Sequence, residues 1–123
     1  MIRMDLPASE CDGRAVVSLR GELDVVEAAS VAAALAAVAG REREMIIDLA
    51  GLEFIDSSGL AALAFVRAQA RRSGGDVVLA APREQVTRLL TLTRLIDVFP
   101  VYASVEQAAN SVGRSVLAAV PLQ

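Results

Sequence analysis

The stretch IDSSGLA at residues 55–61 places an acid and two hydroxyls directly before an alanine- and leucine-rich run. A serine in this setting could be a catalytic nucleophile, a helix cap or the acceptor of a phosphoryl group. Each of these three roles needs different residues elsewhere in the chain. The rest of the sequence therefore helps to choose among them.

A nucleophilic role for Ser57 or Ser58 lacks a general base. A serine nucleophile usually gives its proton to a histidine, or to a lysine in some variants. The chain has no histidine, and all 12 of its basic residues are arginine. The single cysteine, Cys11, cannot assemble a zinc site. We therefore expect no catalytic residue, no metal and no cofactor, in a protein that is not an enzyme.

The cap and the phosphate acceptor both suit the start of a helix. The first N–H groups of a helix have no acceptor within it, and a serine hydroxyl can accept from them. The same N–H groups and the positive end of the helix dipole accommodate a phosphate. Ser57 or Ser58 is thus a candidate N-cap, and Ser57 is also a candidate phosphate acceptor. The acids Asp24, Asp48 and Asp56 are more readily explained as caps than as a catalytic pair.

Strands and helices alternate along the chain and must position this stretch. Strands are expected at 2–6, 14–20, 45–49, 76–81 and 99–102, with Gly21 ending the second and Asp12-Gly13 turning between the first two. Helices are expected at 25–39, 58–72, 83–91 and from Ser104, with Asp24 and Glu27 forming a capping box for the first. This alternation predicts an α/β fold with a mostly parallel sheet.

The composition limits the possible partners and the compartment. At 123 residues and 54% hydrophobic, the chain is expected to form one domain. A net charge of −3 and only 3% aromatic residues argue against direct nucleic-acid binding. The N-terminus does not resemble a secretory signal, and the apolar run at 31–40 is too short to span a membrane. With a lone cysteine, these features predict a cytoplasmic protein without membrane contact.

Four segments, taken in order, resemble a STAS-domain protein of the anti-sigma-factor antagonist type. They are VVSLRGELDVVEA at 16–28, MIIDLAGLEFIDSSGLAAL at 45–63, GGDVVLAAPREQVTRLLTLTRLIDVFPVY at 74–102, and SVEQA at 104–108. The resemblance implies a STAS domain over residues 1–113, with 114–123 as a helix extension or a flexible tail. The implied fold is a central mixed, mostly parallel β-sheet of four to five strands flanked by about four α-helices.

The same resemblance implies a bacterial regulator of a sigma factor that works by partner switching. Such a protein binds an anti-sigma factor that is also a serine kinase, and the kinase phosphorylates the hydroxyl directly after the acid of the DSSGL motif. By position that residue is Ser57, and a serine phosphatase would restore the binding form. The partner-binding residues implied are Asp24, Asp56, Ser57, Ser58, Gly59, Ala61, Ala62 and Phe65.

The resemblance also implies individual roles within this set. Asp24 and Asp56 are expected to shape the surface that faces the kinase, while Ser58 serves the helix start. Gly59 is expected to let the partner backbone approach closely. Ala61 stands where the family often has glycine, a mild departure that leaves the assignment of Ser57 intact.

Two other functions are compatible with a STAS-like domain. One is an interaction module that is never phosphorylated. The other is a small-molecule binding domain, for a nucleotide or a lipid, that uses a pocket beside the DSSGL helix. The oligomeric state is not predicted.

Overall fold

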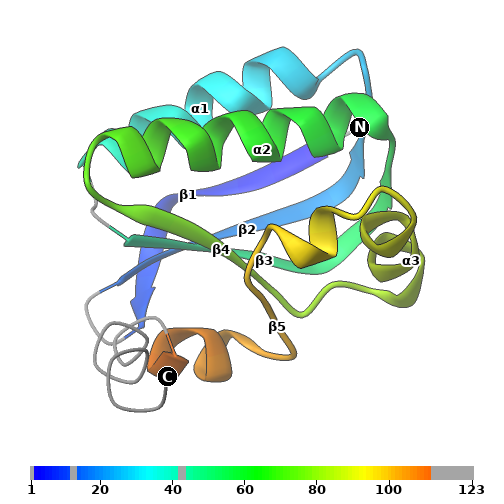
Figure 1. Ribbon diagram of the computed structural model, residues 1–123. Helices are drawn as coiled ribbons and strands as arrows, with labels where there is room; N and C mark the ends of the chain where they lie inside the picture. The colour runs from blue at the N-terminus through cyan, green and yellow to red at the C-terminus, as the bar shows by residue number, and fades with distance from the viewer. Residues whose placement is uncertain (1, 12–13, 42–43, 112–123) are drawn as a thin grey trace.

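Five strands form one mixed sheet in the computed structural model, which describes residues 2–11, 14–41 and 44–111 (Figure 1). In spatial order they are β1 (Ile2–Cys11), β2 (Arg14–Leu23), β3 (Glu44–Ile55), β4 (Asp76–Ala80) and β5 (Val101–Tyr102). β1 is antiparallel to β2, and all later neighbours are parallel. The predicted α/β fold with a mixed, mostly parallel sheet is therefore confirmed. The predicted turn at Asp12-Gly13 and the extension or tail at 114–123 lie outside the described residues.

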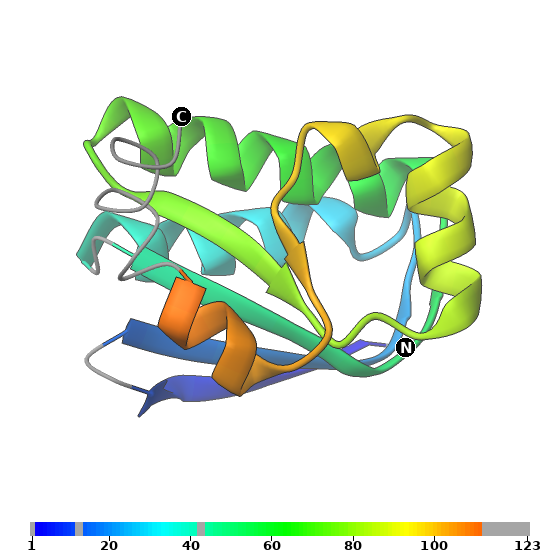
Figure 2. The ribbon, with the colours of Figure 1, turned by 60° about the horizontal axis from the view of Figure 1, so that its bottom comes forward.

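Helices cover both faces of this sheet. α1 (Ala28–Arg41) and α2 (Ser57–Arg72) lie side by side on one face, and helix 105–111 lies on the other (Figures 1 and 2). α3 (Glu84–Leu92) and the short 3-10 helix η1 (Leu95–Asp97) lie near the end of the sheet where α2 begins. The larger apolar core lies on the α1 and α2 face and includes Leu19, Leu35, Ile47, Leu63 and Leu79. A smaller cluster on the other face includes Ile46, Val78 and Ala108.

β2 and β3 are longer than the sequence pattern predicts. β2 does not end at Gly21, which has a positive φ of 97° beside a register shift, but continues to Leu23. β3 continues beyond the predicted 45–49 because Leu52 and Ile55 are buried in the larger core while the strand stays paired with β2. Leu23 and Ile55, the last residues of the two strands, are paired neighbours. The acids that follow them therefore leave the sheet at the same edge.

α1 starts later than predicted and lacks the predicted capping box. Residues 25–27 form a turn, and the helix begins at Ala28. The Glu27 carboxylate accepts a hydrogen bond from the backbone N–H of Ile2 at 2.8 Å, a partner on β1. The acid expected to reach back toward Asp24 therefore ties the turn to the first strand instead.

Candidate functional site

The start of α2 is capped by Asp56 and not by either serine. Asp56 has extended backbone angles, and its Oδ1 accepts a hydrogen bond from the Gly59 backbone N–H at 2.9 Å. Ser57 is already the first residue of the helix, so its hydroxyl is not in the cap position. A carboxylate at this position also interacts favourably with the helix dipole. The prediction that Ser57 or Ser58 caps α2 is therefore wrong, whereas the cap role considered for Asp56 is confirmed.

Asp56 also stabilises the turn between β2 and α1 by a hydrogen bond. Its second carboxylate oxygen, Oδ2, accepts from the backbone N–H of Val25 at 3.1 Å. Asp24 Oδ1 accepts from the backbone N–H of Val26 at 3.1 Å. The Asp56 N–H in turn donates to the Leu23 carbonyl at 3.2 Å. The two acids predicted to shape one surface thus meet there, and both bind backbone.

Ser57 is exposed at the first position of α2. Within the described part of the chain its hydroxyl makes no hydrogen bond. Both oxygens of the neighbouring Asp56 carboxylate, by contrast, accept hydrogen bonds from backbone N–H groups. Ser58 is half-buried. The arrangement presents one accessible hydroxyl next to a fixed negative charge and close to the N–H groups at a helix start.

Gly59 and Ala62 face the protein interior and not the solvent. A Cβ on Gly59 would lie 2.7 Å from Ile55 Cγ1 and 2.8 Å from the Leu23 carbonyl oxygen, so glycine is needed for α2 to pack on β2 and β3. The prediction that Gly59 makes room for a partner backbone is corrected accordingly. Ala62 is only 7% exposed and packs inward, so it is not available for direct partner contact.

Ala61 and Phe65 remain on the solvent side of α2. Ala61 is exposed, and Phe65 is 50% exposed one turn further along the helix. Together with Asp24, Asp56, Ser57 and Ser58 they are the members of the predicted set that the structure leaves at or near the surface.

Sequence reasoning missed two neighbours of this site, Val25 and Val26. They are 68% and 83% exposed on the turn that Asp56 fastens. Their position next to an alanine-rich run is typical of a helix start, and the sequence carries no local signal that separates them from it. The exposure follows from the turn at 25–27, which holds the pair outside α1.

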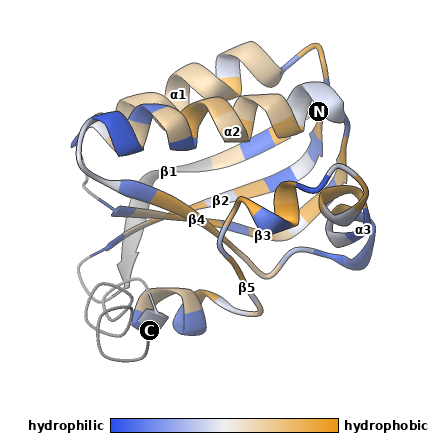
Figure 3. Cartoon of the chain, viewed as in Figure 1, coloured by the Kyte–Doolittle hydropathy of each residue, from blue (hydrophilic) through white to orange (hydrophobic). Residues whose placement is uncertain are grey.

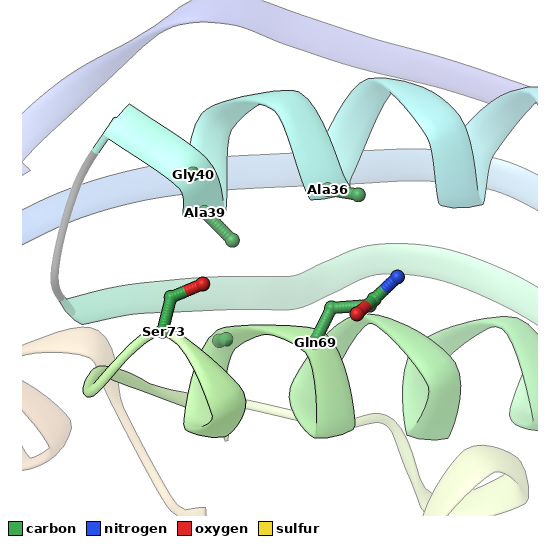
Figure 4. Close-up of a pocket in the computed structure, with 6 residues that line it drawn as sticks. Ala36, Ala39, Gly40, Gln69 and Ser73 are labelled. Atoms are coloured by element: carbon green, nitrogen blue, oxygen red, sulfur yellow. The ribbon is translucent and has the colours of Figure 1, made fainter.

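Over the part of the chain that the structure describes, two hollows stand out beside α2, and Ser57 lines neither of them. One lies between the C-terminal ends of α1 and α2, where the side chains of Ala36, Gln69 and Ser73 line the gap shown in Figure 4. The other lies between α2 and η1 and is lined by Arg67, Arg71 and Phe99 among others. The described residues that line the first hollow are uncharged, so none of them offers a cationic group to a nucleotide phosphate.

The described residues show neither a cluster of metal ligands nor a membrane-spanning helix. No group of three or more His, Cys, Asp or Glu side chains in 2–11, 14–41 and 44–111 could hold a metal ion. Among the helices of these described segments, none is long and apolar enough to cross a membrane.

Known proteins resemble the chain over most of its length. The family model for the STAS domain matches residues 6–108. BtrV of Bordetella bronchiseptica is 32% identical over 107 residues, which cover 86% of this chain and 92% of BtrV. RsfA of Mycobacterium tuberculosis, named an anti-sigma-F factor antagonist, is 30% identical over 104 residues, covering 81% of this chain and 80% of RsfA. The crystal structure of an anti-sigma factor antagonist from Mycobacterium paratuberculosis matches with a TM-score of 0.77 and 31% identity, covering 91% of this chain and 94% of that one.

Proposed function

The chain belongs to the STAS-domain family, as its motifs predict, and we propose that it is an anti-sigma-factor antagonist switched by a phosphate on Ser57. Relatives named as anti-sigma factor antagonists support the general role. Unphosphorylated, the protein binds an anti-sigma factor that is also a serine kinase, and a sigma factor is released. Phosphorylation of Ser57 ends that binding, and a serine phosphatase restores it.

The observation that carries this proposal is the setting of the Ser57 hydroxyl. The hydroxyl is exposed at the first residue of α2, and Asp56 already occupies the cap. A modification of Ser57 therefore removes no hydrogen bond that the helix start needs. N–H groups at the start of a helix, together with its dipole, stabilise a phosphate placed there.

The chemistry of the switch needs no catalytic group from this chain. Ser57 Oγ attacks the γ-phosphorus of ATP, and an O–P bond forms as the bond from that phosphorus to the β,γ-bridging oxygen breaks. ADP leaves with the bridging oxygen, and the hydroxyl proton passes to a base in the kinase. In the reverse direction the phosphatase directs water at the phosphorus, which returns the Ser57 hydroxyl and releases inorganic phosphate.

The phosphate changes the partner-facing surface through its charge. It adds about −1.5 to −2 charges at neutral pH, next to the Asp56 carboxylate. In the complex it would also face the phosphates of the ADP left in the kinase. Repulsion and the cost of desolvating the new charge both oppose binding, and a loss of about 3 kcal/mol lowers affinity roughly a hundredfold.

Binding measurements with Ser57 variants test the switch. With the purified anti-sigma kinase, Ser57→Ala should bind as tightly as the wild type and keep binding after ATP is added. Ser57→Asp should bind at least about tenfold more weakly, which corresponds to roughly 1.4 kcal/mol. Ser73→Asp is the matched control, because it adds the same charge at an exposed serine at the other end of α2.

Other results would favour the alternative functions. If Ser57→Asp bound the kinase as tightly as the wild type, the chain would be better explained as an interaction module without a phosphate switch. If the wild type did not bind the kinase but melted at a higher temperature with a nucleotide or a lipid, a small-molecule binding domain would be supported.

A further inference from the structure

The turn between β2 and α1 exposes two adjacent valines in an ordered conformation. Val25 and Val26 are 68% and 83% exposed, although valine is among the residue types most often buried. The connection appears as a strongly hydrophobic stretch at the edge of the molecule in Figure 3. Single exposed apolar residues are ordinary, whereas contiguous ones are a feature of interaction sites.

The turn is held by its backbone and not by the valine side chains. Val25 and Val26 donate their N–H groups to Asp56 and Asp24, each at 3.1 Å. The N–H groups of Glu27 and Ala28 donate to the Asp24 carbonyl at 3.1 and 2.9 Å. These hydrogen bonds fix the backbone conformation of the turn that carries the two valines. The entropy cost of binding through the valine side chains is therefore lower.

The position of the turn ties it to Ser57. Asp56, whose carboxylate holds the Val25 N–H, is the residue directly before Ser57. The Val25 backbone therefore lies one hydrogen bond away from the residue before Ser57, so the turn and the proposed phosphate acceptor are neighbours on one surface. A kinase that brings a γ-phosphate to Ser57 Oγ approaches that surface.

The charges around the valines indicate the kind of surface that fits them. Residues 22–27 and 53–56 contain five acids and no basic residue; the acids are Glu22, Asp24, Glu27, Glu53 and Asp56. A complementary partner would surround an apolar pocket with arginine or lysine side chains.

We propose that Val25 and Val26 form the main apolar contact with the kinase that phosphorylates Ser57, filling an apolar pocket with a basic rim. The inference rests on the proposed function and adds the contact that determines affinity. Asp56 acts as a positioning residue for this contact, because its carboxylate holds the Val25 N–H.

Affinity measurements with the purified anti-sigma kinase test the inference. Val25→Ser and Val26→Ser should each weaken binding about tenfold or more, since each removes apolar area buried in the complex. Val98→Ser is the matched control, because Val98 is 61% exposed near η1 and should change the dissociation constant less than about twofold. Val26→Thr, which keeps the side-chain shape, provides a second variant should a serine variant fold poorly.

Phosphorylation kinetics separate binding from chemistry. The valine variants should raise KM for the phosphorylation of Ser57 and leave kcat near the wild-type value. If the folded double variant bound within about twofold of the wild type, the valine contact would be refuted while the phosphate switch stood. If the wild type neither bound the kinase nor accepted phosphate, the proposed function would fail and this inference with it.

Discussion

The Asp56 carboxylate lies 3.1 Å from the backbone nitrogen of Val25, 31 residues away in the sequence. The other oxygen of the same carboxylate accepts from the Gly59 N–H at 2.9 Å. One side chain therefore caps the helix that carries Ser57 and holds the turn that displays the two valines. The geometry of the proposed kinase-binding surface therefore depends on Asp56 together with Asp24, which accepts from the N–H groups of Val26, Glu27 and Ala28.

Removal of the Asp56 carboxylate should destabilise the fold. Asp56→Ala loses a helix cap and a hydrogen bond across the sheet edge, which together are worth about 2 kcal/mol of unfolding free energy. Asp56→Asn keeps one oxygen, which can serve the cap but not both N–H groups, and should lose about half as much. Unfolding in urea measures the free energy of unfolding of both variants. An alanine variant as stable as the wild type would show that neither hydrogen bond matters to the fold.

Two glycines on neighbouring helices should respond in opposite directions to alanine. At Gly59 a Cβ would clash with Ile55 and Leu23, so Gly59→Ala should lose about 1–3 kcal/mol in spite of the better helix propensity of alanine. Gly40 lies inside α1 with no heavy atom within 4 Å of an added Cβ. Gly40→Ala should therefore gain about 0.5–1 kcal/mol. Thermal or urea unfolding measures the stability of both variants. A change of stability in the same direction for both would contradict the packing argument.

Arg67 joins α2 to β4 and to the segment after η1. Its Nε lies 2.9 Å from Asp76 Oδ1, its Nη1 donates to the Val98 carbonyl at 2.7 Å, and its guanidinium lies 5.5 Å from the Phe99 ring centroid. Arg67→Met keeps the apolar stem but should cost about 1–3 kcal/mol of unfolding free energy.

The control for Arg67 is an exposed ion pair on α3. Arg88 and Glu84 are 3.8 Å apart, and both side chains are well exposed. Arg88→Met should change stability by less than about 0.5 kcal/mol. Equal losses for the two variants would mean that the hydrogen bonds of Arg67 add nothing beyond a surface ion pair.

The order of elements could be predicted because it depends on local pattern. The short apolar segments at 45–49 and 76–81 have the length of strands, and they form parts of β3 and β4, which both have neighbours on either side in the sheet. The run after IDSSG has a helical composition and forms α2. The family was predictable for a related reason, since the motifs lie at sheet and helix ends whose spacing the fold constrains.

The choice of cap could not be predicted from local sequence. Asp56, Ser57 and Ser58 are three successive side chains that can accept from a helix start. Which of them does so depends on where β3 ends, and that is fixed by the burial of Leu52 and Ile55 in the larger core. A tertiary contact, and not the local sequence, therefore decides which of these three side chains caps α2.

The exposure of Val25 and Val26 could not be predicted from the sequence, for the same physical reason. A pair of valines before an alanine-rich run is compatible with helix. The acceptor that holds the Val25 N–H in a turn is Asp56, which lies 31 residues later in the sequence, directly after β3. The inward orientation of Ala62 likewise depends on how α2 packs. Its sequence neighbours Ser57 and Ser58 are the residues on which the prediction of a phosphate acceptor at this end of α2 rests.

The central claim is tested most directly by mass spectrometry of the chain after incubation with its anti-sigma kinase and ATP. Cleavage after arginine gives a peptide spanning 44–67, in which Ser57 and Ser58 are the only hydroxyl residues. We expect this peptide to gain one phosphoryl group in the wild type and in Ser58→Ala, and none in Ser57→Ala. Phosphate that persists in Ser57→Ala, or a wild-type peptide that stays unmodified by an active kinase, would contradict the account.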